Sequence, residues 1–297
     1  MKTFGKDKLI YYFSPENKPV YFAEDGETFW VETGDCYSGQ IKTVNDLRPN
    51  IDISIVDAAV GPINVSNATP SDTLCVEVVD IQFAPQGVMV TSVGLGVLGK
   101  MIKAPNTKII EIKGGYAHFS DSIKLPLTPM IGVMGVSPKE GRIHCATPGN
   151  HGGNMDTKEV TIGSKVYLPI FVEGAGLAIA DLHACMGDGE LSGTGIETAG
   201  KVCVKVTVIK NKQIERPIIE TDDSIYTIAT EATYEKGIEV AVADMVALLQ
   251  RNLDLDFPDA YRLLSATCDI RISQVVNGVY TLKVRVPRYV INDRSVF

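Results

Sequence analysis

The sequence predicts a mainly β protein, a sandwich or barrel of antiparallel strands, with one pair of helices near its C-terminal end. The main evidence is the alternation of apolar and polar residues along stretches such as VCVKVTVIK at 202–210. There Val202, Val204 and Val206 share one face of a strand, and Lys205 lies on the other. Turn-forming clusters such as EDGE, ATPSDT and APNT separate these stretches at the short spacing that is typical of antiparallel folds.

Other stretches support the same fold class. The segments LCVEVVDIQ and YTLKVRVPRYV alternate in the same way, so we expect both to form half-buried strands. Asn277 and Gly278 stand between two alternating stretches, and an Asn-Gly pair in that position predicts a two-residue hairpin turn.

A helical hairpin is predicted over residues 234–268. Along 234–253 the apolar residues, among them Ile238, Val242 and Met245, recur at the three- and four-residue spacing of one helical face. Pro258 suits the first turn of a second helix, because proline lacks the backbone N–H that this turn leaves unpaired.

Length, composition and charge exclude several classes of protein. The chain has 297 residues, of which 45% are hydrophobic and 22% charged, as in folded globular proteins. We expect one unit over residues 1–297, with a division into two interleaved β subdomains left open. The formal charge of −8 disfavours a nucleic-acid partner, since such partners are bound mainly through Lys and Arg. No apolar run reaches the roughly 18 residues of a membrane span, and the start lacks a secretory signal, so we expect a cytoplasmic protein without a membrane partner.

Two motifs are excluded by their context. The six cysteines contain no C-x-x-C pair, so neither a zinc knuckle nor a disulfide scaffold is predicted. GLGVLG at 94–99 has the spacing of a dinucleotide-binding loop, which requires a helix directly after it. Pro105 and the strand-like TKIIEIKGG follow instead, so we expect no nucleotide cofactor.

The stretch TPGNHGGNMD at 147–156 is a candidate for ligand binding. Its glycines allow backbone conformations that bring a main chain close to a ligand, and His151, Asn154 and Asp156 between them can bind hydrogen-bonding or metal partners. The same residues also form ordinary surface turns, and this alternative stays open.

The stretch DLHACMGDGE at 181–190 predicts a metal or acid–base site. Asp181 and His183 are two residues apart on a strand, so their side chains project from the same face. Gly187 and Gly189 allow a tight turn that brings Glu190 back to the same place. Asp, His and Glu are ordinary ligands of zinc and similar ions, and so many ionisable groups beside apolar strands require compensation.

Cys185 lies inside the same stretch and is a candidate nucleophile if its thiolate is stabilised. No local signature supports that role, so we interpret Cys185 as a buried thiol beside the cluster.

The sequence resembles the acetamidase/formamidase amidohydrolases over nearly its whole length. The resemblance is carried by YYFSPENKPV, ETGDCYSGQI, GPINVSNATPSDTLCVEVVDI and AYRLLSATCDIRISQVV. Its most specific part runs from TPGNHGGNMD through YLPIFVEGAGLAIADLHACMGDGELSGTGIE. The resemblance implies hydrolysis of a small aliphatic amide, acetamide or formamide, to a carboxylate and ammonia. It also implies a CUB-like or jelly-roll β fold and a homodimer or larger homo-oligomer.

A mechanism follows as a hypothesis from this resemblance. A divalent metal, zinc with calcium as the alternative, would be held by Asp181 and His183, with Asp35 of the ETGDCYSG turn as a third ligand. The metal would lower the pKa of a bound water and accept the oxyanion, and Glu190 would carry the proton from water to nitrogen. Asn154 and backbone amides of the glycine loop would hold the substrate.

The roles within the acid cluster stay open, as does the class of function. Asp156, Asp188 and Glu197 are rivals of Glu190 as proton shuttle and of the predicted ligands. One alternative function is a metal-independent thiol amidase that uses Cys185 with Glu190 as its base. The other is a non-catalytic β-sandwich whose acids hold calcium.

Overall fold

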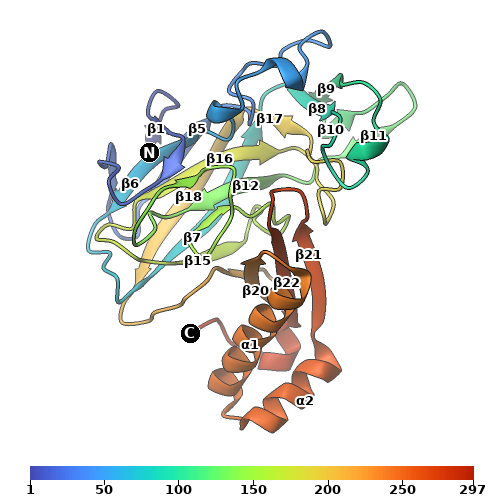
Figure 1. Ribbon diagram of the computed structural model, residues 1–297. Coiled ribbons are helices and arrows are strands. Elements are labelled where there is room, and N and C mark those ends of the chain that lie inside the picture. Colours follow the sequence, from blue (N-terminus) through green and yellow to red (C-terminus); the bar gives the residue numbers. More distant parts are fainter.

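The computed structural model describes all residues 1–297 and shows a mainly β chain, which confirms the predicted fold class. Two large sheets face each other (Figure 1), and most strand pairs within them are antiparallel. The first sheet has nine strands in the spatial order β1 (Lys2–Phe4), β5 (Thr28–Thr33), β18 (Gly200–Ile209), β7 (Thr73–Phe83), β15 (Lys165–Pro169), β19 (Ile218–Glu220), β20 (Ser224–Glu231), β22 (Tyr280–Pro287) and β21 (Asp269–Gln274).

The second sheet has eleven strands and carries most of the candidate site. Its main path runs β11 (Lys124–Pro126), β10 (Tyr116–His118), β9 (Asn106–Lys113), β8 (Gln86–Thr91), β17 (Glu197–Thr198), β16 (Leu177–His183), β12 (Met130–Gly135) and β14 (Gly152–Asn154). Strand β6 (Ala59–Val65) pairs with β16 and also with β2 (Leu9–Ile10) and β4 (Tyr21–Ala23). A separate small sheet joins β3 (Tyr12–Phe13) to β13 (Ile143–His144).

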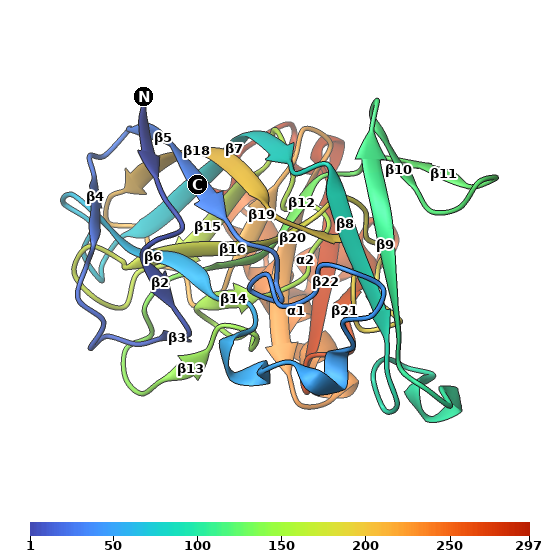
Figure 2. The same ribbon diagram turned by 90° about the horizontal axis from the view of Figure 1, so that it is seen from above.

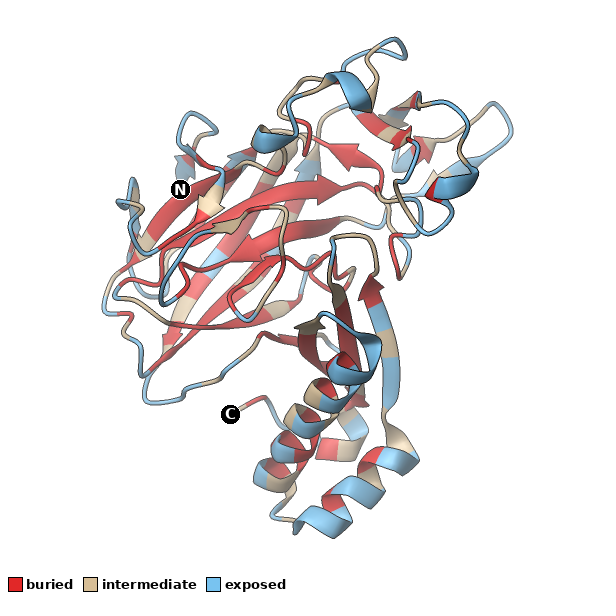
Figure 3. Ribbon diagram, viewed as in Figure 1, coloured by how far each residue is buried: buried red, intermediate tan, exposed pale blue.

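A core of 31 buried apolar residues fills the space between the two large sheets. Val76 and Val204 come from the first sheet, Ile131 and Ile179 from the second, and none of the four is exposed. Figure 3 shows the strands of the sandwich as mostly buried and the connecting loops as exposed. Removal of this apolar surface from water is the main stabilisation of the sandwich, and it follows from the period of two in the sequence.

The predicted helical hairpin is confirmed at the C-terminal end. Thr233 is the N-cap of helix α1 (Tyr234–Leu253), and its side chain accepts a hydrogen bond from Lys236 N. Asp256 is the N-cap of α2 (Phe257–Thr267). Buried residues of α1 pack against β20 and β22, so the helices cover one face of this part of the first sheet (Figure 1). Neither helix is long and apolar enough to cross a membrane.

The hairpin at Asn277 is longer than the sequence predicted. Strand β21 ends at Gln274 and β22 begins at Tyr280, so five residues connect them instead of two. The physical reason is a competing partner, because Gly189 N donates to Ser273 O and Val275 N donates to Gly189 O. Gln274 also stabilises the longer loop, since its Oε1 accepts hydrogen bonds from the backbone N–H groups that follow it.

The glycine stretch at 94–99 lies between β8 and β9, which extend to one side of the sandwich (Figure 2). A single 3-10 turn, Gly99–Met101, follows the stretch before β9 begins at Asn106. No α-helix starts there, so the predicted absence of a dinucleotide-binding βα unit agrees with the structure.

Candidate active site

The end of strand β16 carries Asp181 and His183. Their side chains lie on the same side, since His183 Nε2 is 3.2 Å from Asp181 Oδ1. Strand β17 pairs with this end of β16 and sets Glu197 directly opposite His183, where Glu197 Oε2 lies 3.0 Å from the same ring nitrogen. One imidazole therefore lies between two carboxylates, and all three side chains are buried.

The glycine-rich loop adds Asp156 and Asn154. Strand β14 pairs with β12 and β12 pairs with β16, so this loop lies beside the end of β16. Asp156 Oδ1 is 3.9 Å from His183 Nε2. With its amide nitrogen turned toward the acids, Asn154 donates to Asp181 Oδ2 at 3.2 Å and to Asp156 at 3.1 Å. Asn154 was predicted to hold the substrate, and in the structure its amide nitrogen bridges two carboxylates.

A glycine provides the room for these two carboxylates. Gly132 of β12 lies opposite Asp181 in the register of the sheet. A Cβ at Gly132 would collide with the Asp181 carboxylate and come within 2.6 Å of Asp156 Oδ1. Asp156, Asp181 and Glu190 all have positive φ, at 42°, 58° and 48°. Such conformations cost free energy and are found at functional sites.

Glu190 reaches the cluster from the turn that follows β16. Glu190 N donates to Gly187 O at 3.2 Å, and Gly189 has a φ of 95°, which a residue with a side chain rarely adopts. Glu190 forms a group with Asp156 and His183 in which the possible ligand atoms all lie within 4.8 Å of one another. The turn thus joins the two motifs that are separate in the sequence.

Two residues of the cluster were not found by sequence reasoning. Cys36 forms a second group with Asp181 and Glu197, again with the possible ligand atoms within 4.8 Å of one another. Asp57 is also buried, and its backbone N–H donates to Cys36 O at 2.7 Å. Neither residue stands in a local sequence pattern of metal ligands. Cys36 is adjacent to the predicted ligand Asp35, and this was the one sequence signal for it; Asp57 had none.

Asp35, the third predicted ligand, has another local role. Its Oδ1 accepts hydrogen bonds from the backbone N–H groups of Tyr37 and Gly39, at 2.9 and 3.1 Å. These bonds shape the turn that places the neighbouring Cys36 in the cluster. The geometry therefore favours Cys36 over Asp35 as the donor from this turn.

His151 and Cys185 lie outside the two ligand groups. His151 is buried, its ring packs edge-on against Phe13, and neither ring nitrogen has a hydrogen-bond partner. Burial lowers the pKa of His151 to about 4. Cys185 is half-buried and not buried as predicted, because it lines a groove that also reaches Glu190; its Sγ is 3.3 Å from the carbonyl oxygen of Pro126.

Asp188 faces away from the cluster and pairs with lysines. Its two carboxylate oxygens lie 2.7 Å from Lys283 Nζ and 2.9 Å from Lys158 Nζ. The lysines hold the pKa of Asp188 below its usual value although partial burial opposes this. Both carboxylate oxygens of Asp188, the alternative to Glu190 as proton shuttle, are therefore paired with lysines.

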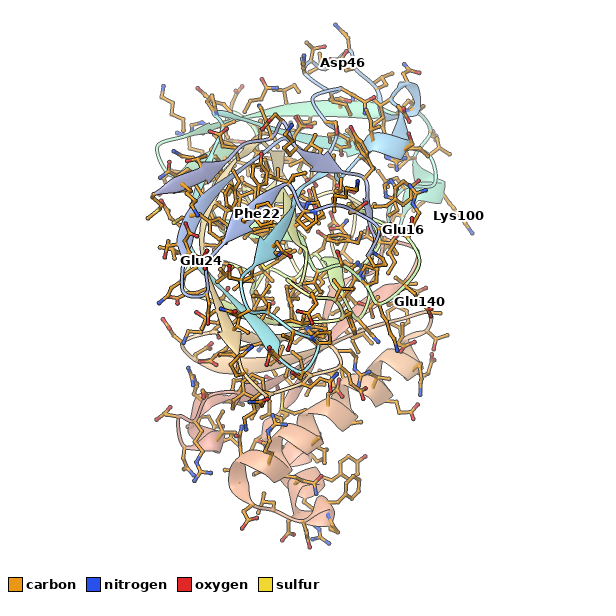
Figure 4. The ribbon with its side chains drawn as sticks, turned by 90° about the vertical axis from the view of Figure 1, so that its left-hand side faces the viewer. Glu16, Phe22, Glu24, Asp46, Lys100 and Glu140 are labelled. Carbon is orange, nitrogen blue, oxygen red and sulfur yellow. The ribbon has the colours of Figure 1, made fainter.

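The cluster concentrates negative charge inside the protein. Exposed carboxylates such as Glu16, Glu24 and Glu140 lie at the outside of the molecule (Figure 4). In contrast, five carboxylates are buried around His183, namely Asp57, Asp156, Asp181, Glu190 and Glu197. One imidazolium cannot neutralise five carboxylates, so some of them are protonated or a further cation compensates.

The pKa values of the cluster show this charge excess. Burial raises the pKa of Asp156 and of Asp181 to about 6, with nearby carboxylates adding to the effect. Burial and the charge of Asp156 raise the pKa of Glu190 well above its usual value. Burial disfavours the charged form of His183, but Glu197 and Asp181 outweigh it and raise the pKa of the imidazole.

The residues present fit a divalent cation. Glu197 Oε2 is buried and has no hydrogen-bond partner apart from its 3.0 Å ion-pair contact with His183 Nε2, and the buried carboxylates outnumber their basic partners. Carboxylate oxygens, an imidazole nitrogen and a thiol sulfur together form a donor set that zinc accepts, whereas calcium takes oxygen donors alone. A cavity of about 290 Å³ opens onto the cluster and is lined by Cys36, Asp57, Asp181, Glu190, Glu197 and Arg48 among others.

The charge excess leads to a prediction for the metal-free protein. The carboxyls of Asp156 and Asp181 have a pKa of about 6 in the folded state and 3.8 as the ordinary value. Protonation therefore favours the folded state, and this contribution is lost as the pH rises from about 4 to about 6. We expect the unfolding temperature of chelator-treated protein to fall over this range.

The control for this measurement is the same protein with zinc added. If a cation binds the cluster, the stability should not fall between pH 4 and 6 by this route, since a bound cation favours the ionised carboxylates. His151 acts in the opposite sense. Its lowered pKa contributes stability that is present above pH 6.5 and lost as the pH falls toward 4. A rise of the unfolding temperature from pH 4 to 6 in the chelated protein would contradict the prediction.

Comparison with known proteins shows the family of the chain. The sequence profile of the Acetamidase/Formamidase family matches residues 5–144 and 142–290, which together include every member of the cluster. The chain belongs to the Acetamidase/Formamidase family.

Solved structures resemble this family member over almost its whole length. An acetamidase of Bacillus halodurans has 38% identity and a TM-score of 0.96, over 98% of each chain. A predicted acetamidase/formamidase of Thermoanaerobacter tengcongensis has 42% identity and a TM-score of 0.96, over 99% of each chain. The formamidase of Methylophilus methylotrophus is 27% identical in an alignment of 257 positions, which covers 66% of this chain and 63% of the relative. The chain thus spans less than two thirds of the length of that formamidase.

Proposed function

We propose that the protein hydrolyses the carbon–nitrogen bond of a small amide and releases a carboxylate and ammonia. The observation that carries this proposal is the buried cluster of Asp156, Asp181, His183, Glu190 and Glu197, which opens onto a cavity of about 290 Å³. Membership of the Acetamidase/Formamidase family and the names of the relatives support amides as the substrate class. The cavity is polar and of a size that suits a small substrate.

We propose zinc as the cofactor, with calcium as the alternative. Asp181, His183 and Glu197 would hold it, with Cys36 as a further donor, because their possible ligand atoms lie together at the end of β16. A divalent cation supplies a Lewis acid for the amide carbonyl and for the attacking water. The imidazole nitrogen and the thiol favour zinc.

Glu190 is the proposed proton shuttle. Its carboxylate is buried beside Asp156 and lines the cavity, so it can take a proton from the attacking water. Returning that proton to the amide nitrogen allows the carbon–nitrogen bond to break and ammonia to leave. A pKa raised above the usual value favours the return of the proton from Glu190 to the amide nitrogen.

Asn154, Asn277 and Asp156 are the proposed positioning groups. Asn277 Nδ2 donates to Asp156 Oδ2 at 2.6 Å, and Asn154 bridges Asp156 and Asp181. These amides reduce the mutual repulsion of the carboxylates and fix their direction. Asp156 stays the rival of Glu190 in proton transfer because it lies in the same group.

An apolar groove next to the site bears on the preferred amide. The groove has a volume of about 560 Å³, is lined by Met89, Phe119 and Leu125 among others, and includes Glu190 in its wall. An acyl chain longer than that of acetamide would find apolar surface there. The preferred amide is therefore best determined with substrates of increasing acyl length.

The test is the release of ammonia from formamide, acetamide and propionamide, with and without a chelator. The proposal expects release from at least one of these amides and its loss on chelation, with recovery when zinc is added. Release that resists chelation would favour the thiol amidase, since Cys185 and Glu190 line the same groove. No release at all would favour the non-catalytic metal-binding module.

We also propose a symmetric homodimer or larger homo-oligomer, as the resemblance implied. Large apolar side chains are exposed on α2 and on the adjacent strand β21, including Phe257, Tyr261 and Ile270, and symmetric assemblies are common among soluble proteins. We expect a mass of at least two chains by light scattering across working concentrations. A monomeric mass throughout that range would refute the proposal.

A further inference from the structure

A fully buried lysine lies below the turn that carries Glu190. Lys283 is in the middle of β22 and has no exposed surface. Its Nζ lies 2.5 Å from Glu159 Oε2 and 2.7 Å from Asp188 Oδ1. A buried ammonium group is tolerated only with partners of this kind, so both contacts restrain the segments that provide them.

The two carboxylates belong to different parts of the chain. Glu159 lies after the glycine-rich loop, whereas Asp188 lies between Gly187 and Gly189, two residues before Glu190. Asp188 is 30% exposed and Glu159 only 9%, so the Lys283–Asp188 contact is at the outer end of the pair. Among the partners of this lysine, Asp188 alone is in the turn of the site.

The backbone of the same turn is also attached to the C-terminal hairpin. Gly189 N donates to Ser273 O at 2.8 Å, and Val275 N donates to Gly189 O at 3.2 Å. The following residue, Glu190, has a φ of 48°, a conformation that persists only when the surrounding structure holds it. The ion pair of Asp188 with Lys283 and the backbone hydrogen bonds of Gly189 are the contacts that restrain the chain directly before Glu190.

We infer that Lys283 is a positioning residue that acts through Asp188 to hold the Glu190 carboxylate in the site. This inference rests on the proposed function, in which Glu190 transfers the proton. The C-terminal strands thereby take part in the reaction without contributing a group that touches the substrate. A continuous series of contacts runs from β22 to the Glu190 carboxylate through Lys283, Asp188 and the turn.

Asp188→Ala and Glu159→Ala form a matched pair of variants. Each removes one carboxylate partner of Lys283 and leaves the other, so neither variant leaves the buried charge unpaired. We expect Asp188→Ala to lower kcat about 10- to 100-fold with KM within about threefold, because a small misplacement of a reacting group has effects of this size. Glu159→Ala should lose stability and keep kcat within about threefold of the parent.

A double-variant comparison shows whether the effect passes through Glu190. In a Glu190→Gln background, Asp188→Ala should lower kcat by no more than about twofold further, since the group that it positions is already absent. A full additional loss in that background would overturn the inference. Equal loss of kcat in Asp188→Ala and Glu159→Ala would also overturn it, because a general structural role would affect both.

Hydrogen exchange provides a readout that does not depend on activity. The backbone amides of residues 187–191 should exchange faster in Asp188→Ala and in Lys283→Met than in the parent, and unchanged exchange in Glu159→Ala is expected. Unchanged exchange in Asp188→Ala would overturn the inference whether or not the protein hydrolyses amides. Absence of ammonia release by the parent protein would instead count against the proposed function.

Discussion

Glu190→Gln is expected to lower the turnover of a small amide by about 10²- to 10⁴-fold, the usual contribution of a positioned proton shuttle. Glutamine keeps the shape of the side chain but cannot accept and return a proton at neutral pH. The Glu190 carboxylate is buried beside Asp156 and His183, so few other groups can reach the same proton. The measurement is kcat for ammonia release at saturating amide, with metal content determined on the same samples.

Two variants serve as controls for this prediction. Glu140→Gln makes the same change at an exposed carboxylate and should leave kcat unchanged. Cys185→Ser should keep most of the activity if water is the nucleophile, and should nearly abolish it if a thiolate attacks. Near-normal hydrolysis by Glu190→Gln would remove Glu190 from the mechanism and pass the role to Asp156, the remaining acid of the same group.

Asp181→Asn and His183→Ala are each expected to lose bound metal and activity together while the protein stays folded. The two side chains lie 3.2 Å apart at the end of β16. Each substitution would remove one donor from the proposed zinc site. Removal of one ligand weakens metal binding directly, so metal content by mass spectrometry is the primary measurement. His118→Ala, a histidine of β10 outside the cluster, is the matched control.

Asp35→Asn and Cys36→Ser decide which residue of the turn is a donor. Cys36 lies with Asp181 and Glu197, whereas Asp35 binds two backbone N–H groups of its own turn. We therefore expect weaker metal binding in Cys36→Ser and little change in Asp35→Asn.

For the two variants of β16, full metal content in both Asp181→Asn and His183→Ala would mean that the ligands lie elsewhere.

The sequence by itself determined the mainly β class and the two helices, and it predicted three residues of the candidate site. The period of two along β18 and the period near 3.6 along α1 both depend on neighbours within one element, so they can be detected without knowing the fold. Asp181 and His183 are two residues apart on one strand, and Glu190 follows through glycines. Such local spacing already limits where these three side chains can lie.

Only the tertiary structure decided which distant residues join them. Cys36 and Asp57 reach Asp181 from far along the chain, and Glu197 reaches His183 through the pairing of β17 with β16. Register between strands is set by packing and hydrogen bonding over the whole sheet, and no local pattern encodes it.

The hairpin at Asn277 illustrates the same limit. Its Asn-Gly pair favours a two-residue turn, but the C-terminal end of β21 pairs with Gly189 and the loop has five residues. That longer loop is what carries Asn277 to Asp156, and the next strand carries Lys283 to Asp188. A contact between residues that are 95 positions apart depends on the packing of the C-terminal strands against the sandwich, which a one-dimensional pattern does not contain.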